Sequence, residues 1–511
     1  MDIGYSLIAG LLVILLLFVL VYFSDLTGVV TSWITWCRDI YHIRSLPSPP
    51  GRWFWGNALE VTDTQESLEY MQENHKKYPT WCVYWMGPTI PFVYTANLEI
   101  MKIILKSEVK KPDVYAFFRK WLGDGLAISS DEKWKRHRKL LTPAFHLDIL
   151  KQYIPVFNEV SHKLLDKWSG LADSGESVEV TEHLHLYTLD VLMRCTFYSN
   201  SNCLEKEEIP YVTASCELEY LLMNRVFSPQ YFFDWVYFST AAGRRFLHCC
   251  DVVHEYSEEV IMKRREELLK GTQQSQPRKY LDFLDVLLSV KDENGKGLTD
   301  TEIREEVDTF MFAGHGTTAS ALGWIMYCLG QHVEHQKLCR EEIREVLAGR
   351  DSDDITWEDL SKLSYTTMCI KESLRLYPLG PLIGKKLSEE IVAGGYRIPK
   401  GIYCAGGTYI GLGIYVMHHD PSVWSDPEKF DPLRFTIESC KKMDPFAYLA
   451  FSAGPRNCIG QRFALHELQV TTSHILNKFK LDVDSTHTVE PCVNVVYKAR
   501  NGIKMKLSPA L

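Results

Sequence analysis

The sequence contains no C-x-x-C pair, although it has 14 cysteines. This absence excludes zinc ribbons, thioredoxin-type redox motifs and c-type haem attachment, which all need two closely spaced cysteines. A chain of 511 residues buries about three quarters of its unfolded surface, so it needs no disulfide bonds for stability. We therefore expect most of the cysteines to be reduced, buried side chains of a protein that faces the cytosol.

The sequence also lacks an excess of positive charge, because 56 lysines and arginines stand against 65 aspartates and glutamates, a formal net charge of −9. Nucleic acid is excluded as a partner, since its binding needs a basic field. Internal repeats and low-complexity segments are absent too. A composition of 46% hydrophobic and 24% charged residues is typical of a globular protein and excludes a disordered or collagen-like chain.

Charged residues are missing from Ile3 to Ser24, where residues 11–23 form an unbroken apolar run. A helix of this length spans a hydrocarbon core of about 30 Å. The alternative is a cleavable signal peptide, which needs a basic segment before the apolar core and small residues at a cleavage site after it. The sequence has Asp2 before the core and Asp25-Leu26-Thr27 after it, so we expect a transmembrane anchor.

The first cations, Arg38 and Arg44, follow the apolar segment, which places Met1 in the lumen and the rest of the chain in the cytosol. Residues 47–50, with three prolines, predict a stiff hinge. We expect three parts: an anchor at residues 1–24, an interfacial segment and proline-rich hinge at 25–51, and a body at 52–511. The chain ends without a KDEL-type signal, so residence in the endoplasmic reticulum membrane would rest on the anchor.

The body is predicted to be mainly α with small β-sheets. An apolar period of 3.6 residues predicts helices around Leu164–Trp168, Glu258–Leu269, Ile303–Leu329 and Gln336–Leu347. Short stretches rich in β-formers predict strands at Trp81–Met86, Ile391–Ile398 and Ile503–Leu507. Lys270–Lys279 has no apolar side chain and is predicted to be an exposed loop.

One cysteine differs from the others in its surroundings: Cys458 lies in the segment Phe451–Gly460, FSAGPRNCIG. Two glycines and a proline predict a rigid loop whose backbone N–H groups point toward the sulfur, and a helix is expected to begin directly after it. Both features favour a thiolate and a lowered pKa. A fixed thiolate is what axial ligation of haem iron requires; the alternative is a buried structural cysteine.

The segment matches F-x-x-G-x-R-x-C-x-G, and the chain resembles the cytochrome P-450 superfamily over about residues 45–508. Three further elements occur in the family's order: Trp134 with Arg138, Glu372 with Arg375, and Arg434. The resemblance implies the P-450 fold, with residues 52–511 as a haem-thiolate domain, haem b as the cofactor and Cys458 as its axial iron ligand. It assigns a set of residues to binding or supporting the haem: Trp134, Arg138, Phe451, Arg456, Lys385 in place of a usual arginine, and the triad Glu372, Arg375 and Arg434.

Tyr115–Leu126, Lys139–His146 and Val307–Ser320 resemble family 4, the fatty-acid and eicosanoid ω-hydroxylases. This implies a microsomal monooxygenase that hydroxylates lipids at or near the ω end with O2 and electrons from NADPH. Its partners would be a P-450 reductase, with cytochrome b5 as a further candidate, the membrane and a lipid substrate. The basic run at residues 133–139 would suit reductase docking, or it is a solvated surface. Four aromatic side chains either line a substrate channel or pack in the core: Tyr115, Phe117, Phe118 and Trp121.

The chain departs from the family pattern at two positions that bear on catalysis. Gly316 stands where most members carry an acid before the threonine, here Thr317, that helps deliver protons to dioxygen. His315 projects about 200° from Thr317 around the helix and is a poor substitute. Many family 4 members place an ester-forming glutamate where Ala313 stands, so we expect non-covalent haem.

Gly316 predicts inefficient coupling that Gly316→Asp would improve, and it keeps two alternatives open. One is a haem-thiolate isomerase or dehydratase of lipid peroxides, and the other is a weakly active haem protein that binds lipid. The stretch Tyr403–Met417 is longer and richer in glycine than the family pattern, which indicates either a real loop or an error in the gene model.

Overall fold

The structure of the chain is a computed structural model that describes residues 40–510, apart from residues 89, 108, 173–174, 198, 200–201, 207, 272–281 and 400–409. The predicted fold class is confirmed, because helices dominate and the sheets are small. The longer helices are α2 (Gln65–Lys77), α3 (Leu98–Lys106), α5 (Asp131–Leu141), α7 (Ile154–Ala172), α8 (Val180–Thr196), α9 (Pro210–Val226), α11 (Ala241–Gly271), α13 (Asp300–Gln331), α14 (Val333–Leu347), α15 (Ser364–Leu376) and α18 (Gln461–Lys478). The shorter helices are α4 (Arg119–Leu122), α6 (Leu147–Leu150), α10 (Asp234–Ser239), α12 (Phe283–Ser289), α16 (Ile414–His418) and α17 (Ile437–Lys442).

The largest sheet has five strands in the order β1 (Cys82–Trp85), β2 (Pro91–Thr95), β8 (Ile410–Gly413), β5 (Leu382–Leu387) and β3 (Val109–Lys110). β2 and β8 are parallel, and the other neighbours are antiparallel. A second sheet pairs β4 (Val178–Glu179), β12 (Lys504–Pro509) and β9 (Phe479–Val483). Two hairpins are formed by β6 (Ile391–Ala393) with β7 (Tyr396–Ile398) and by β10 (Pro491–Val493) with β11 (Tyr497–Ala499). The three predicted β segments all contain strands.

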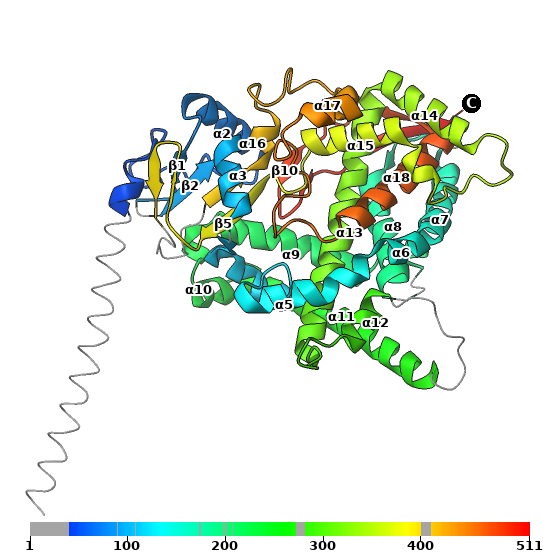
Figure 1. Cartoon of the computed structure of the whole chain (residues 1–511), viewed down its shortest axis with the longest axis horizontal. Coiled ribbons are helices and arrows are strands. Elements are labelled where there is room, and N and C mark those ends of the chain that lie inside the picture. Colours follow the sequence, from blue (N-terminus) through cyan, green and yellow to red (C-terminus); the bar gives the residue numbers. More distant parts are fainter. Residues whose placement is uncertain are drawn as a thin grey trace, which may run out of the picture.

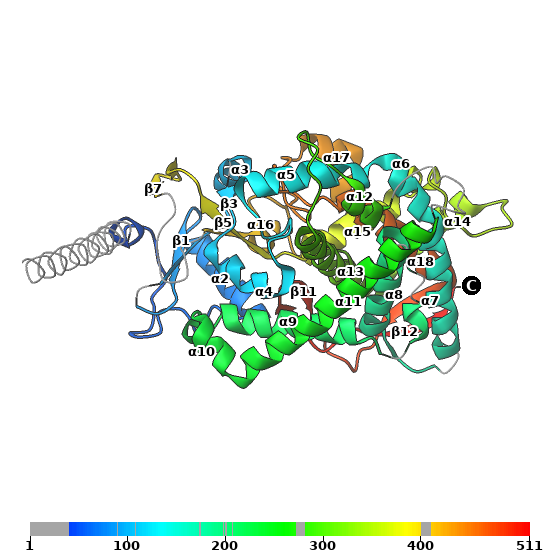
Figure 2. The ribbon, with the colours of Figure 1, turned by 90° about the horizontal axis from the view of Figure 1, so that it is seen from below.

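Helix α13 is the axis around which the other helices pack. A capping box starts it: the Glu302 backbone N–H donates to the Thr299 hydroxyl at 3.2 Å, and the Thr299 N–H donates to the Glu302 carboxylate at 2.8 Å. α13 crosses the centre of the molecule between α8, α11, α15 and α18, as both views show (Figure 1, Figure 2). Most of its C-terminal half is buried, so its side chains face packed protein on nearly every side.

Several sequence predictions fall wholly or partly outside the described residues. The apolar segment at residues 3–24 does so, and no helix among residues 40–510 as described is long and apolar enough to cross a membrane. The predicted loop at 270–279 is wrong at its start, because α11 continues to Gly271, and residues 272–279 are not described. Of Tyr403–Met417, the part from Ile410 onward is described: it forms strand β8 of the main sheet and most of helix α16, which follows directly.

Candidate active site

A cavity of about 350 Å³ lies between the middle of α13 and the loop that precedes α18. Its wall is mainly apolar, and four sequence-predicted site residues contribute to it: Ala313, Thr317, Phe451 and Cys458. Ala313 and Thr317 lie one turn apart on α13, where the Thr317 hydroxyl donates to the Ala313 carbonyl at 2.6 Å. The fold therefore brings two distant predicted motifs to one cavity.

The loop that carries Cys458 has a backbone that only particular residues allow. Ser452 and Gly454 have φ values of 57° and 74°, in the left-handed region that favours glycine. A Cβ at Gly454 would lie 2.1 Å from the Leu105 carbonyl oxygen of α3, so Gly454 is required for both conformation and space. The loop closes where the Cys458 N–H donates to the Phe451 carbonyl at 3.0 Å. The predicted rigid loop is confirmed.

The Cys458 thiol is exposed to the cavity, and the cavity itself lies inside the protein. Burial raises its pKa above the ordinary value, while the Gly460 N–H and the Arg138 guanidinium act in the opposite direction. The prediction that the loop and the start of the following helix lower this pKa is therefore wrong in direction, because desolvation outweighs the two favourable contacts. A metal cation bound at Cys458 would supply the missing stabilisation, since a coordinating thiol is deprotonated by the charge of the metal.

One buried and two half-buried cations gather near the same loop. Lys385 on β5 is 5% exposed, and burial, together with the nearby Arg456, lowers its pKa to about 8. Burial, and then the charges of Lys385 and Arg456, lower the pKa of Lys111 well below its ordinary value. Arg456 lies 4.0 Å over the Trp134 ring and donates to the Ser129 carbonyl at 2.8 Å.

None of Lys111, Lys385 and Arg456 forms an ion pair with another residue in the part of the chain that the structure describes. Cations that are shielded from water and have no counter-ion are costly, and the two carboxylates of haem b would compensate Lys385 and Arg456. The donor set therefore fits haem propionates. Arg138 has another use, because it donates to the Asn457 backbone carbonyl at 3.0 Å and to its side-chain oxygen at 2.9 Å, which ties α5 to the cysteine loop.

The basic run of α5 carries little free charge. Lys133 pairs with Glu305 at 3.1 Å, Arg136 pairs with Asp292 at 2.8 Å, and Lys139 pairs with Glu293. Most of its cations thus have acidic partners on neighbouring segments, so this helix is a compensated surface more than a free positive patch.

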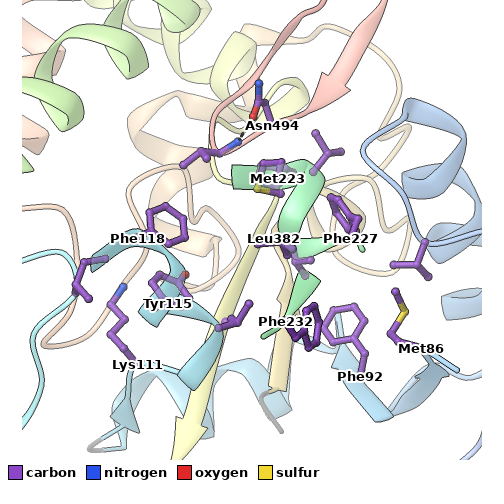
Figure 3. Close-up of a pocket in the computed structure, with 18 of the residues that line it drawn as sticks. Met86, Phe92, Lys111, Tyr115, Phe118, Met223, Phe227, Phe232, Leu382 and Asn494 are labelled. Carbon is purple, nitrogen blue, oxygen red and sulfur yellow. Dashed lines mark hydrogen bonds between the residues drawn. The ribbon is translucent and has the colours of Figure 1, made fainter. Parts of the chain in front are cut away.

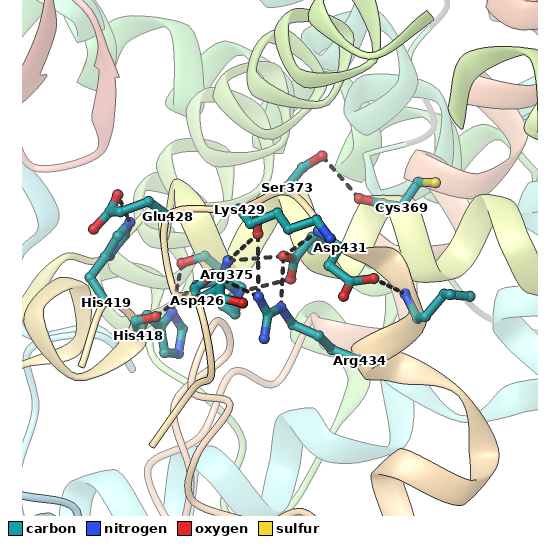
Figure 4. A network of polar contacts seen from close by, with 12 residues as sticks. Cys369, Ser373, Arg375, His418, His419, Asp426, Glu428, Lys429, Asp431 and Arg434 are labelled. Atoms are coloured by element: carbon teal, nitrogen blue, oxygen red, sulfur yellow. Dashed lines mark hydrogen bonds and ion pairs between the residues drawn. The ribbon is translucent and has the colours of Figure 1, made fainter. Parts of the chain in front are cut away.

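The predicted triad forms but does not line the cavity. Arg375 donates to Glu372 at 2.8 and 2.9 Å, and Arg434 donates to the same carboxylate at 3.3 Å. Glu372 and Arg375 are fully buried. Arg375 also donates to the His418 carbonyl at 2.7 Å, and the Arg434 guanidinium reaches the Asp426 carbonyl at 2.8 Å (Figure 4). The triad therefore fixes the chain between His418 and Arg434, and its contribution to the haem site is indirect.

Gly316 is buried and faces away from the cavity. A Cβ at this position would lie 3.3 Å from Oε1 of Glu219, a residue of α9 that is 1% exposed. His315 also faces away, as predicted, with its Nε2 3.1 Å from Nδ1 of His185. Glu219 was not among the predicted site residues, because no motif or spacing in the sequence connects it to α13.

A second cavity of about 240 Å³ adjoins the first and shares Phe312 and Val495 with it. Its wall is largely apolar, with Lys111 and Tyr115 at one end and Met86 and Phe92 at the other (Figure 3). Of the four predicted channel aromatics, Tyr115 and Phe118 line this cavity. Phe117 and Trp121 pack in the core, at ring distances of 4.1 Å from the Arg225 guanidinium and 4.7 Å from Phe312.

The family model for Cytochrome P450 matches residues 46–507, close to the span of the resemblance. The chain therefore belongs to the cytochrome P-450 family, monooxygenases that use haem b and electrons derived from NADPH. Cytochrome P450 4F6 of Rattus norvegicus is 41% identical over 497 residues, which cover 94% of this chain and 90% of the relative. The Ultra-long-chain fatty acid omega-hydroxylase of Homo sapiens is 41% identical over 488 residues (93% and 91%), and the Leukotriene-B4 omega-hydroxylase 3 of Mus musculus is 41% identical over 487 residues (92% and 91%). The predicted membership of family 4 is confirmed.

We expect Glu372→Ala to destabilise the protein by about 3–5 kcal/mol, because it leaves the buried Arg375 without its counter-charge. Urea unfolding followed by circular dichroism measures this effect. Glu217→Ala is the matched control, since its ion pair with Arg245 is partly exposed and surface pairs contribute little. Equal effects of the two substitutions would contradict the structural role of the triad.

Proposed function

We propose that the protein hydroxylates long-chain fatty acids or related lipids at or near the ω end: RH + O2 + NADPH + H⁺ gives ROH + H2O + NADP⁺. The observation that carries this proposal is the pair of adjoining apolar cavities, one at Cys458 and one with Lys111 at its end. A long apolar chain with a terminal carboxylate is complementary to this arrangement. The names of two relatives, which describe ω-hydroxylases of a fatty acid and of leukotriene B4, support the same substrate class.

The chain's own residues divide the work around the cofactor. When bound, haem supplies the redox chemistry that inserts one oxygen atom into a C–H bond. Cys458 is assigned as its axial thiolate ligand, and Lys385, Arg456 and Trp134 as the groups that hold the propionates. Thr317 presents a hydroxyl at the cavity wall that can hold and pass a proton. The apolar side chains around it exclude water from the reacting carbon.

We place the protein in the endoplasmic reticulum membrane, with residues 1–24 as the anchor and a reductase in the cytosol as the electron donor. The uncharged stretch from Ile3 to Ser24 supports an anchor. Aromatic side chains also favour a membrane interface: Trp53, 96% exposed, is followed by exposed Phe54 and Trp55 at the start of the body.

The proposal is tested with a panel of fatty acids, NADPH and reductase, with product analysis by mass spectrometry. We expect ω and near-ω alcohols that depend on both NADPH and reductase. Cys458→Ala should abolish these products and the thiolate-type carbon monoxide difference spectrum, because alanine offers no ligand. Retention of that spectrum by the variant would refute the ligand assignment. Rearrangement of lipid hydroperoxides without reductase, or lipid binding without turnover, would favour the two alternatives over hydroxylation.

Lys111 is expected to bind the substrate carboxylate, because it lines the second cavity and Lys385 and Arg456 do not. Lys111→Gln should raise KM for a fatty acid roughly tenfold, the loss of one hydrogen bond to a charged group. KM for the alcohol of the same chain length should change little. Lys110→Gln is the control, since Lys110 is an exposed neighbour that pairs with Asp131 at 2.9 Å. A parallel rise in both KM values, or an equal effect of Lys110→Gln, would rule out carboxylate recognition by Lys111.

Ala313 lines the cavity that contains Cys458 and has no nucleophile, so acid–acetone extraction should release the haem completely from the wild type. Ala313→Glu should retain a fraction of the haem on the polypeptide after turnover, because a carboxylate there can form an ester. We also expect the wild type to hydroxylate carbons next to the terminal methyl as well as the methyl itself. Haem that stays with the wild-type chain would refute non-covalent binding; pure ω products would refute only the relaxed selectivity.

A further inference from the structure

The carboxylate of Glu219 lies against the α13 backbone at Gly316, next in sequence to Thr317. Oε1 of Glu219 is 3.3 Å from the position that a Cβ at Gly316 would take. Any larger side chain at position 316 would therefore make a tight contact with the Glu219 carboxylate, which would have to shift slightly. Glycine at 316 leaves room on this face of α13 for an acid supplied by α9.

Glu219 forms an ion pair with a lysine whose side chain is partly exposed to solvent. Its Oε2 lies 2.7 Å from Nζ of Lys498 on β11, whose side chain is 15% exposed while that of Glu219 is 2% exposed. Burial acts to lower the pKa of Lys498, but the Glu219 carboxylate together with the Cys216 and Cys492 thiols outweighs burial, so the pKa is raised overall. The pair is thus a buried carboxylate with a charged ammonium that reaches toward solvent.

The other titratable groups around this pair are poor acids or bases at neutral pH. Burial and Lys498 lower the pKa of His315 to about 3, and burial lowers that of His185 well below its ordinary value. Burial and Glu219 raise the pKa of the Cys216 thiol to about 11. Among the described residues that pack here from α8, α9, α13 and β11, Glu219 and Lys498 are therefore the charged pair.

We propose that Glu219 is the positioning acid for proton delivery toward Thr317, supplied by α9 in place of a side chain at position 316. A proton from solvent is taken up by the Glu219 carboxylate, while Lys498 stays protonated as its counter-charge. It then passes by way of water to the Thr317 hydroxyl and on to the oxygen that leaves as water. Each proton is replaced from solvent, so the pair has the same charge before and after turnover. The inference rests on the monooxygenase activity of the family and not on the proposed lipid or its ω position.

The first test compares Glu219→Gln with wild type in the full-length holoenzyme with reductase. Glutamine keeps the size and a hydrogen bond but removes the acid, so kcat should fall about tenfold to hundredfold. The solvent deuterium isotope effect on kcat should increase, because proton transfer becomes slower than the other steps. Glu217→Gln on the same helix should change neither value, since its ion pair with Arg245 lies at the surface. Hydrogen peroxide released per NADPH is recorded with each variant, because it does not depend on which carbon is hydroxylated.

The second test moves the acid back to α13. Gly316→Asp in the wild type places two carboxylates together with one lysine. In contrast to the expectation from the sequence alone, the unfolding temperature should therefore fall and turnover should not improve. In the Glu219→Gln background the same Asp has Lys498 to itself, so it should restore kcat and lower the isotope effect, without the loss of unfolding temperature. The thermal measurement needs no turnover and stays informative if one variant is inactive.

Three results would overturn the proposal. The first is an unchanged kcat and isotope effect in Glu219→Gln. The second is an equal gain in turnover from Gly316→Asp in both backgrounds. The third is a loss in Glu219→Gln that is confined to the unfolding temperature, which would make the Glu219–Lys498 pair a clamp between α9 and β11 and nothing more.

Discussion

The site depends first on one buried ion pair, between Glu372 and Arg375 of α15. Arg375 forms two hydrogen bonds to the carboxylate and one more to the His418 carbonyl. The His418 ring donates back to the Arg375 carbonyl at 3.0 Å and accepts the Leu449 N–H at 3.0 Å, and Leu449 lines the cavity that contains Cys458. A chain of buried polar contacts therefore runs from α15 to the start of the cysteine loop. Ions this deep are stable only with every partner in place, so the network imposes one path on the chain that leads to Cys458.

The cations of this site fall into two groups, those that pair with an acidic residue of the chain and those that do not. On α5 the cations have acidic partners, and Arg138 binds the Asn457 carbonyl. Lys385, Arg456 and Lys111 lack such partners among the described residues, although burial lowers the pKa of each. Shielding an unpaired cation from water is unfavourable unless a bound anion compensates its charge. Two carboxylates on the haem and one on a lipid would compensate three cations, which links cofactor retention and substrate choice to a single cluster.

Features that the local sequence determines could be predicted, whereas features that depend on long-range packing could not. The periodicity of residues 303–329 predicted α13, and the composition of the cysteine loop predicted its rigidity, which the φ of Gly454 and the Leu105 contact account for. The pKa of Cys458 was wrong in direction, because loop composition reports hydrogen-bond donors but not the amount of surrounding protein. The sequence also could not predict which of the four aromatic side chains line a cavity. Phe117 and Phe118 are adjacent in sequence, and only the positions of α9 and α13 decide which one lines it.

Glu219 could not be predicted for the same reason. The residues of a proton relay must lie close together in space, but they need not be close in sequence. What the reaction needs is an ionisable group near the turn of α13 that holds Thr317, with access to solvent. An acid at position 316 would meet that need from within the helix, and its Cβ would lie 3.3 Å from Oε1 of Glu219. In our proposal the two residues therefore belong together, because the glycine at 316 leaves room and the glutamate on α9 supplies the acid. The apparent loss of an acid from the motif becomes, in three dimensions, a change in which helix supplies it, and Lys498 on β11 supplies the counter-charge that keeps the displaced carboxylate in a buried position.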